Sequence, residues 1–157
     1  MNPEKNIAAA SALEQVQTMI ASARLGTLAS LMAGSGAPYA SLVNVAFFEE
    51  APLLLLSQLA WHTKNILADG RACLLLCAAS QGKDPLAAPR VSLMGDISAS
   101  EDPRARETYL SQHPNARSYA DFADFRYFRL NVETAHYVAG FGQIITIEMG
   151  GSVIWTI

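Results

Sequence analysis

The chain has 157 residues, of which 51% are hydrophobic and only 16% are charged. This length suits one domain with a buried core, and so few charges leave part of the surface available for an oligomer contact. The net charge of −3 argues against the basic surface that binds DNA or RNA. No apolar run is long enough to span a bilayer and the N-terminus lacks a basic-then-apolar leader, so we expect a cytoplasmic protein without membrane contact.

The chain begins with a predicted helix and continues mainly as strands. Leu13, Val16, Ile20 and Ala23 form one apolar stripe, which predicts a helix within residues 1–24. Strand patterns follow in "GTLASLM", "PYASLVNVAFF", "LLLLS", "ACLLLCAA", "RVSLMGDISAS" and the long stretch from 127 to 157. Short turns between them indicate antiparallel pairing, and such a sheet hides its edges by closing into a barrel. We therefore predict a mainly β fold with flanking helices.

Helices are predicted at two further places inside one domain of residues 1–157. A short helix near 63–69 is closed by Gly70, and helical segments near 102–123 begin at Asp102-Pro103 and are interrupted at Pro114. The barrel core is expected over 25–147, with a C-terminal strand over 148–157.

Two cysteines, Cys73 and Cys77, lie in one predicted strand. Four residues of strand separate them by about 13 Å, which is too far for a disulfide. We expect two buried thiols, and no metal site is predicted.

Polar side chains concentrate where an apolar strand gives way to the short helix, in "LSQLAWHTKNILADG". A helix N-terminus exposes unpaired N–H groups that suit an anion, and Ser57, His62, Thr63 and Lys64 add donors there. The pattern is typical of a phosphate site, although Thr63 serving only as an N-cap and Lys64 as a solvated charge explain it as well.

Two other positions, Arg90 and Asn44, are candidates for weaker reasons. Arg90 begins an apolar strand, where it either reaches a ligand over the barrel mouth or pairs with an acid such as Asp84 or Asp96. Asn44 is a polar residue within a strand. His113 and His136 are expected to cap a helix and to pack in a strand, and no catalytic triad is apparent.

In combination, "GTLAS", "GAPYASLVNVAF", "PLLLLSQLAWHTKNILADGRACLLL", "DPLAAPRVSLMGDIS" and "HYVAGFG" resemble the FMN-binding split-barrel proteins related to pyridoxamine 5′-phosphate oxidase. The resemblance covers about residues 20 to 145 and is strongest to the haem-utilisation (HugZ-type) branch. It implies a six-stranded antiparallel split β-barrel and a homodimer with FMN in each groove between subunits.

The resemblance also implies a set of cofactor contacts. The flavin phosphate is held by the positions matched here by Ser57, Trp61, His62, Thr63 and Lys64. The strand Ser41, Leu42, Val43, Asn44 runs along the flavin ring, and Arg90 takes the place of a ring- or phosphate-contacting residue. The oxidase itself carries a strongly basic strand where this chain has only Ser41 to Asn44, so we expect a different small-molecule substrate.

Three hypotheses follow. The first is a dimeric FMN-dependent oxidoreductase of unknown substrate, with no catalytic residue named. The alternative is a haem-binding or haem-degrading protein that uses the same groove, with His62, His113 or His136 as the axial ligand. The third is a non-catalytic module that binds flavin or another small ligand.

Overall fold

The structure is a computed structural model that describes residues 3–79, 82, 84–140, 144–148 and 152–156. In this part of the chain, nine strands form one antiparallel sheet, where six were expected. The strands are β1 (Leu25–Leu31), β2 (Pro38–Asn44), β3 (Ala46–Phe48), β4 (Ala51–Ser57), β5 (Arg71–Cys77), β6 (Arg90–Ala99), β7 (Phe125–Val138), β8 (Ile144–Glu148) and β9 (Ser152–Thr156).

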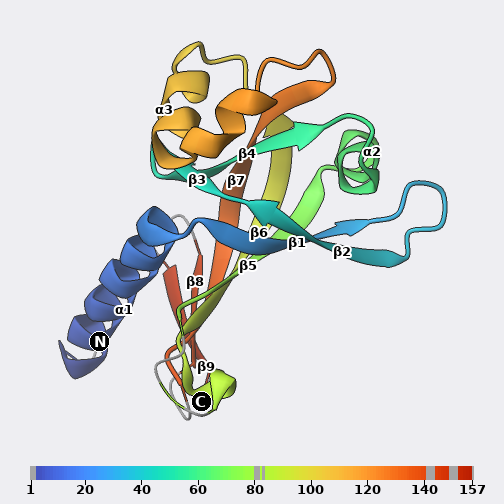
Figure 1. The fold of residues 1–157 in the computed structure, drawn as a ribbon. Coiled ribbons are helices and arrows are strands. Elements are labelled where there is room, and N and C mark those ends of the chain that lie inside the picture. Colours follow the sequence, from blue (N-terminus) through green and yellow to red (C-terminus); the bar gives the residue numbers. More distant parts are fainter. Residues whose placement is uncertain (1–2, 80–81, 83, 141–143, 149–151, 157) are drawn as a thin grey trace.

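The sheet curls because its two ends are neighbours in the chain. Its order is β2-β1-β5-β6-β7-β4-β3, yet only Val45 separates β2 from β3 in sequence. The backbone N–H of Val45 donates to the carbonyl of Arg24, which ties this corner to the end of the first helix. The result is a curled antiparallel half-barrel with helices around it (Figure 1), which confirms the predicted fold class in its coarse form.

The additional strands come from the last third of the chain. The first residues of β7 pair with β4 and its last residues pair with β8, while β6 pairs along nearly all of it. β9 then pairs with β8. The predicted C-terminal strand over 148–157 is therefore present as Ser152–Thr156, and residues 149–151 and 157 lie outside the described part.

The helices lie close to their predicted places. They are α1 (Pro3–Ser22), α2 (Trp61–Ala68) and α3 (Arg104–Gln112), with 3₁₀ turns η1 (Pro85–Ala87) and η2 (Pro114–Ser118). Pro114 ends α3 as expected, because proline has no N–H to continue the helix. In Figure 1, α3 lies above β3 and β4, α2 lies beside β1 and β2, and α1 extends from the other side of the sheet.

The core is divided by β4, which explains why the whole strand is apolar. Leu54 and Leu56 face the barrel interior, where they join residues of β1, β5, β6, β7 and α1. Leu53 and Leu55 face the opposite way, toward α3 and η2. Since successive side chains of a strand point to opposite faces, a strand covered on both sides is apolar throughout.

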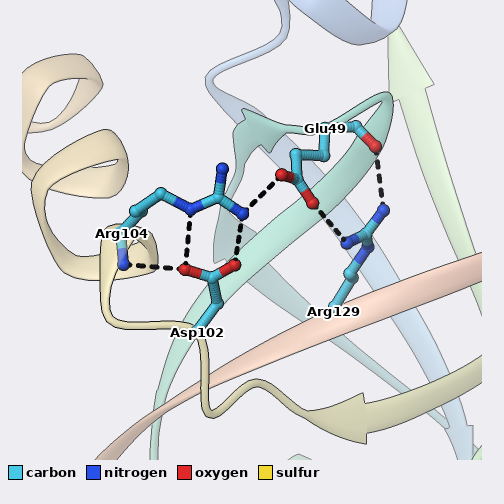
Figure 2. Close-up of polar contacts among 4 residues, drawn as sticks. All are labelled: Glu49, Asp102, Arg104 and Arg129. Atoms are coloured by element: carbon cyan, nitrogen blue, oxygen red, sulfur yellow. Dashed lines mark hydrogen bonds and ion pairs between the residues drawn. The ribbon is translucent and has the colours of Figure 1, made fainter.

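The turn between β3 and β4 has an unusual backbone. Glu49 and Glu50 have φ angles of 46° and 63°, as in the tight hairpin turns that glycine and asparagine favour. Figure 2 shows the Glu49 carboxylate between Arg104 of α3 and Arg129 of β7, and Arg104 also binds Asp102. Both guanidinium groups also lie over the Phe48 ring, at 5.3 and 5.9 Å from its centroid. This network fastens the hairpin to α3.

The two cysteines differ in burial. Cys73 is half-buried, but Cys77 is exposed, so the prediction that both thiols are buried is wrong for Cys77. Cys77 is the last residue of β5, opposite Arg90, and the apolar core stops at Leu76.

Within the described residues, none of the helices has the length and apolar character needed to cross a membrane.

Candidate ligand-binding groove

A groove of 290 Å³ opens where β2, β4 and the start of α2 meet. Five of the predicted site residues line it, namely Leu42, Val43, Asn44, Ser57 and His62. A sixth, Ser41, contacts His62. A larger cavity of 390 Å³ lies between α1 and the sheet. None of the ten predicted site residues, all in the described part of the chain, lines that cavity.

His62 is the one imidazole in the wall of the groove, among the residues that the structure describes. Its Nδ1 lies 3.1 Å from the Ser41 hydroxyl on β2. Burial lowers the pKa of His62 below its ordinary value of 6.5, because a desolvated imidazolium is disfavoured. The neutral form of the ring therefore predominates at pH 7, and a neutral imidazole has one nitrogen that can accept a proton or a metal ion.

Thr63 and Asn65 face away from the groove, into the barrel. Asn65 donates to the Ser30 hydroxyl at 3.1 Å and accepts from the backbone N–H of Ala33 at 3.1 Å, so it anchors α2 to β1. The Thr63 side chain is 0% exposed, and its hydroxyl has no hydrogen-bond partner among the described residues. The structure therefore does not bring Thr63 into the groove.

The beginning of α2 carries the polar backbone groups of the site. Ala60 is the N-cap residue and offers no side-chain hydrogen bond. The first turn of a helix contains N–H groups that the helix itself does not pair, and here they lie next to Ala60 and His62 in the groove wall. Because these groups carry partial positive charge, they favour a carboxylate or phosphate at this place. Lys64 is exposed on the same turn.

Ser57 is held by a residue that the sequence pattern did not indicate. Its hydroxyl donates to the Asp124 carboxylate and accepts from the backbone N–H of Leu59. Asp124 precedes β7 and is 67 residues away along the chain. This pair fixes the floor of the groove, where β4 ends beside the start of β7.

Apolar side chains form the rest of the groove and its rim. The sequence reasoning missed the wall residues Leu55, Leu56, Tyr119 and Phe125. Four large apolar side chains, which we call the rim, are exposed on the segments that flank the groove: Leu42 (68%), Leu59 (72%), Trp61 (58%) and Phe122 (58%). Trp61 contacts Tyr39 of β2, with ring centroids 6.2 Å apart.

Arg90 lies at the far end of the sheet from the groove. Ser57 is opposite Phe125 and Arg90 is opposite Val138, so 13 residues of β7 separate the two places. This corresponds to about 40 Å along the strand. Arg90 donates to the backbone carbonyl of Leu86 at 2.9 Å. Within one chain the structure does not bring it together with the other predicted site residues.

The family described as "CREG, beta-barrel" matches residues 4–151. The chain belongs to this family. As a CREG β-barrel protein, it is 31% identical over 142 residues to an atypical chloroplastic haem oxygenase, HOZ, of Arabidopsis thaliana, a match that covers 87% of this chain and 43% of that protein. The chain thus spans less than half the length of this curated relative.

Two solved structures illustrate what this chain is similar to in fold. A heme binding protein from Mycobacterium smegmatis is 35% identical, with a TM-score of 0.82 over 86% of this chain and 57% of that one. A general-stress-protein-26-related protein of the pyridoxinephosphate oxidase family from Clostridium acetobutylicum has a TM-score of 0.67 at 13% identity, over 87% and 94% of the two chains, and shows the shared fold alone. The predicted resemblance to split-barrel proteins is confirmed, and for the oxidase type it is a likeness of fold.

Proposed function

We propose that this protein binds haem in the groove at His62. The observation that carries the proposal is an apolar groove with one neutral imidazole in its wall. Apolar walls suit the porphyrin faces, and the imidazole is a haem-iron ligand of the ordinary kind. Support comes also from two relatives above 30% identity, one described as a haem oxygenase and one as a heme binding protein.

Different groups in the groove suit different parts of the haem molecule. Leu42, Val43 and Phe125 offer apolar surface for the macrocycle. The unpaired N–H groups at the start of α2 suit the propionates, which are carboxylates. Bound haem would supply an iron centre that takes an axial ligand from the protein and, when reduced, binds dioxygen.

The groove alone is small for a whole porphyrin, and this observation leads to the proposal of a dimer. Its 290 Å³ lies at the lower limit of ligand sites, which hold roughly 300 to 1,000 Å³. The rim residues Leu42, Leu59, Trp61 and Phe122 expose large apolar side chains on the segments that flank the groove. We infer that a second copy of the chain covers this rim, so that each ligand is enclosed between two subunits.

FMN is the second candidate, and the start of α2 favours it. A phosphate monoester carries more charge and more acceptor oxygens than one carboxylate, and helix N-termini are established phosphate sites. The exposed Lys64 on the first turn adds a positive charge. With FMN the protein would be an oxidoreductase of an unknown small substrate, since a bound flavin supplies hydride transfer.

The absorption spectrum of the purified protein distinguishes the two ligands. The protein is mixed with haemin in one sample and FMN in another, and each is passed through a gel-filtration column. A sharp Soret band that travels with the protein supports haem binding, and a retained two-banded flavin spectrum supports FMN. Retention of flavin but not of haemin would overturn the first proposal in favour of the second.

A further inference from the structure

The three histidines of the chain differ in what their ring nitrogens already bind. His113 is committed to the fold: its Nε2 lies 2.8 Å from the backbone carbonyl oxygen of Val45, and its ring is 4.8 Å from the ring of Tyr109. The neighbouring Gln112 bonds both the N–H and the carbonyl of Phe47. This pair of residues fastens the end of α3 to the β2–β3 corner, so His113 is not available to a ligand.

His136 is placed away from the groove. It lies in β7 opposite Ser92 of β6, and its Nδ1 is 3.0 Å from the Thr146 hydroxyl of β8. The groove is at the other end of β7, where Phe125 lines it. Eleven residues of strand separate positions 125 and 136, or about 36 Å.

His62 has the arrangement that metal-binding histidines show. One ring nitrogen, Nδ1, is held by the Ser41 hydroxyl. The other, Nε2, has no hydrogen-bond partner in the part of the chain that the structure describes, although the ring lines the groove. A ligating histidine usually donates its second ring N–H to an oxygen, which fixes the ring orientation and the tautomer. Ser41 is such an oxygen.

We propose that His62 is the axial ligand of the haem iron, through Nε2, and that Ser41 is a positioning residue. This inference rests on the proposed haem binding. Ligation through Nε2 requires the proton on Nδ1, from where it is donated to the Ser41 oxygen. The opposite tautomer, in which Ser41 donates to Nδ1 and Nε2 carries the proton, leaves no lone pair for the iron. The direction of the hydrogen bond between Ser41 and His62 therefore determines whether Nε2 can bind the iron.

The local fold keeps the two residues in register without help from the ligand. Ser41 is central in β2, where its backbone is paired with Leu28 of β1. His62 is fixed by α2, which Asn65 ties to β1 through Ser30 and the backbone of Ala33. Both side chains are therefore carried by elements anchored on the same strand, and the distance between them is set by the fold.

The test is a haemin titration of four proteins: wild type, His62→Ala, Ser41→Ala and His136→Gln as the matched control. The wild type and the control should give the same Soret band, and their reduced forms the iron–histidine stretching band in resonance Raman spectra. His62→Ala should lose that band and bind haemin at least tenfold more weakly. Added imidazole should restore the wild-type spectrum of His62→Ala, because it fills the space of the lost ring.

Ser41→Ala should keep the histidine ligand but shift its stretching band and weaken haemin binding about tenfold, as expected for loss of an outer hydrogen bond. A wild-type iron–histidine band in His62→Ala overturns the inference while haem binding itself stands. A wild type that binds no haemin overturns both. His62→Cys guards against misfolding of the alanine variant, since a thiolate ligand gives its own spectrum if position 62 reaches the iron.

Discussion

Thr63 carries a hydroxyl that is fully buried and has no partner among the described residues. Replacement by valine removes this polar atom and keeps the shape, so Thr63→Val should raise the free energy of unfolding by about 1 kcal/mol. Thr63→Ser keeps the hydroxyl and loses a buried methyl group, so it should lower the free energy of unfolding by about 1 kcal/mol. Urea unfolding measures both.

The same variant tests the site. Because Thr63 faces the barrel interior, Thr63→Val should bind haemin and FMN as the wild type does. A large loss of FMN binding would mean that the hydroxyl contacts the phosphate, as the sequence pattern suggested, and that α2 sits differently when the ligand is bound.

The depressed pKa of His62 predicts a specific dependence of stability on pH. Its folded pKa lies below its ordinary value of 6.5, so the unfolded chain binds the proton more readily. Stability should therefore fall as the pH drops from about 6.5 toward the folded pKa, and level off below it. Lys64 lies on the same helix turn as His62, and Asp124 is bound to Ser57, which also lines the groove.

The comparison is with His62→Gln, which keeps a polar side chain and does not titrate. Denaturation between pH 5 and 7.5 should show the wild type losing stability relative to this variant on acidification. Parallel curves for the two proteins would contradict a desolvated His62.

At the scale of elements, the start of α2 has no side-chain cap. An introduced cap should therefore compete with the anionic group of a ligand for the unpaired N–H groups of the first turn. Ala60 is the N-cap residue and makes no side-chain hydrogen bond. Ala60→Asp adds a carboxylate cap, which should stabilise the protein by about 1 kcal/mol. It should also weaken binding of any ligand whose anionic group occupies that place.

Ala60→Ser is the matched control, because it caps the helix without adding charge. Both variants should melt at a higher temperature than the wild type, and the aspartate should lose more ligand affinity than the serine. Unchanged affinity in Ala60→Asp would place the propionates or the phosphate elsewhere.

The β3–β4 turn combines two neighbouring residues whose replacement should have opposite effects. Glu49→Ala removes the partner of Arg104 and Arg129 and should lower the free energy of unfolding slightly, with less effect at high salt. Glu50, with a φ of 63°, is free of those ion pairs. Glu50→Gly relieves the positive φ and should stabilise by about 0.5 kcal/mol. Thermal unfolding of the two variants at low and high salt measures both effects.

The elements themselves were largely predictable, because their signals are local. The apolar run of β4 and the stop of α3 at Pro114 are examples. The count of six strands failed because a three-residue strand such as β3 has no pattern of its own, and because β7 pairs with β4 and β8 on different parts of its length.

The site was predictable only in part, for a physical reason. The cluster at the start of α2 is nearly contiguous in sequence, and two of its members, Ser57 and His62, line a groove. Ser41 and His62, however, are 21 residues apart, and Ser57 and Asp124 are 67 apart. Such pairs arise from the way α2 and the strands pack together in the fold. The sequence did not indicate that Thr63 points inward. A polar residue is expected on the exposed face of a helix, but Thr63 lies on the buried face of α2 with Ile66.

At the scale of the whole molecule, the exposed rim predicts that assembly and ligand binding are coupled. Four large apolar side chains are exposed on the segments that flank the groove, and the groove of one chain is small for the proposed ligand. If a second copy covers them, Leu42→Asp should convert a dimer into a monomer of 16.9 kDa, because a buried unpaired carboxylate is costly. Leu67→Asp is the control: it is as exposed, at 63%, but does not line the groove. Sedimentation equilibrium measures the mass.

If assembly and ligand binding are coupled, ligand should also promote formation of the dimer. A ligand enclosed by two subunits binds the dimer better than the monomer, so haemin should shift dilute wild-type protein toward the dimer. The monomeric Leu42→Asp protein should bind haemin more weakly, and its affinity should not depend on protein concentration. A wild type that is monomeric with and without haemin would show that one chain forms the whole site, with Leu42 and Trp61 left in contact with water beside the ligand.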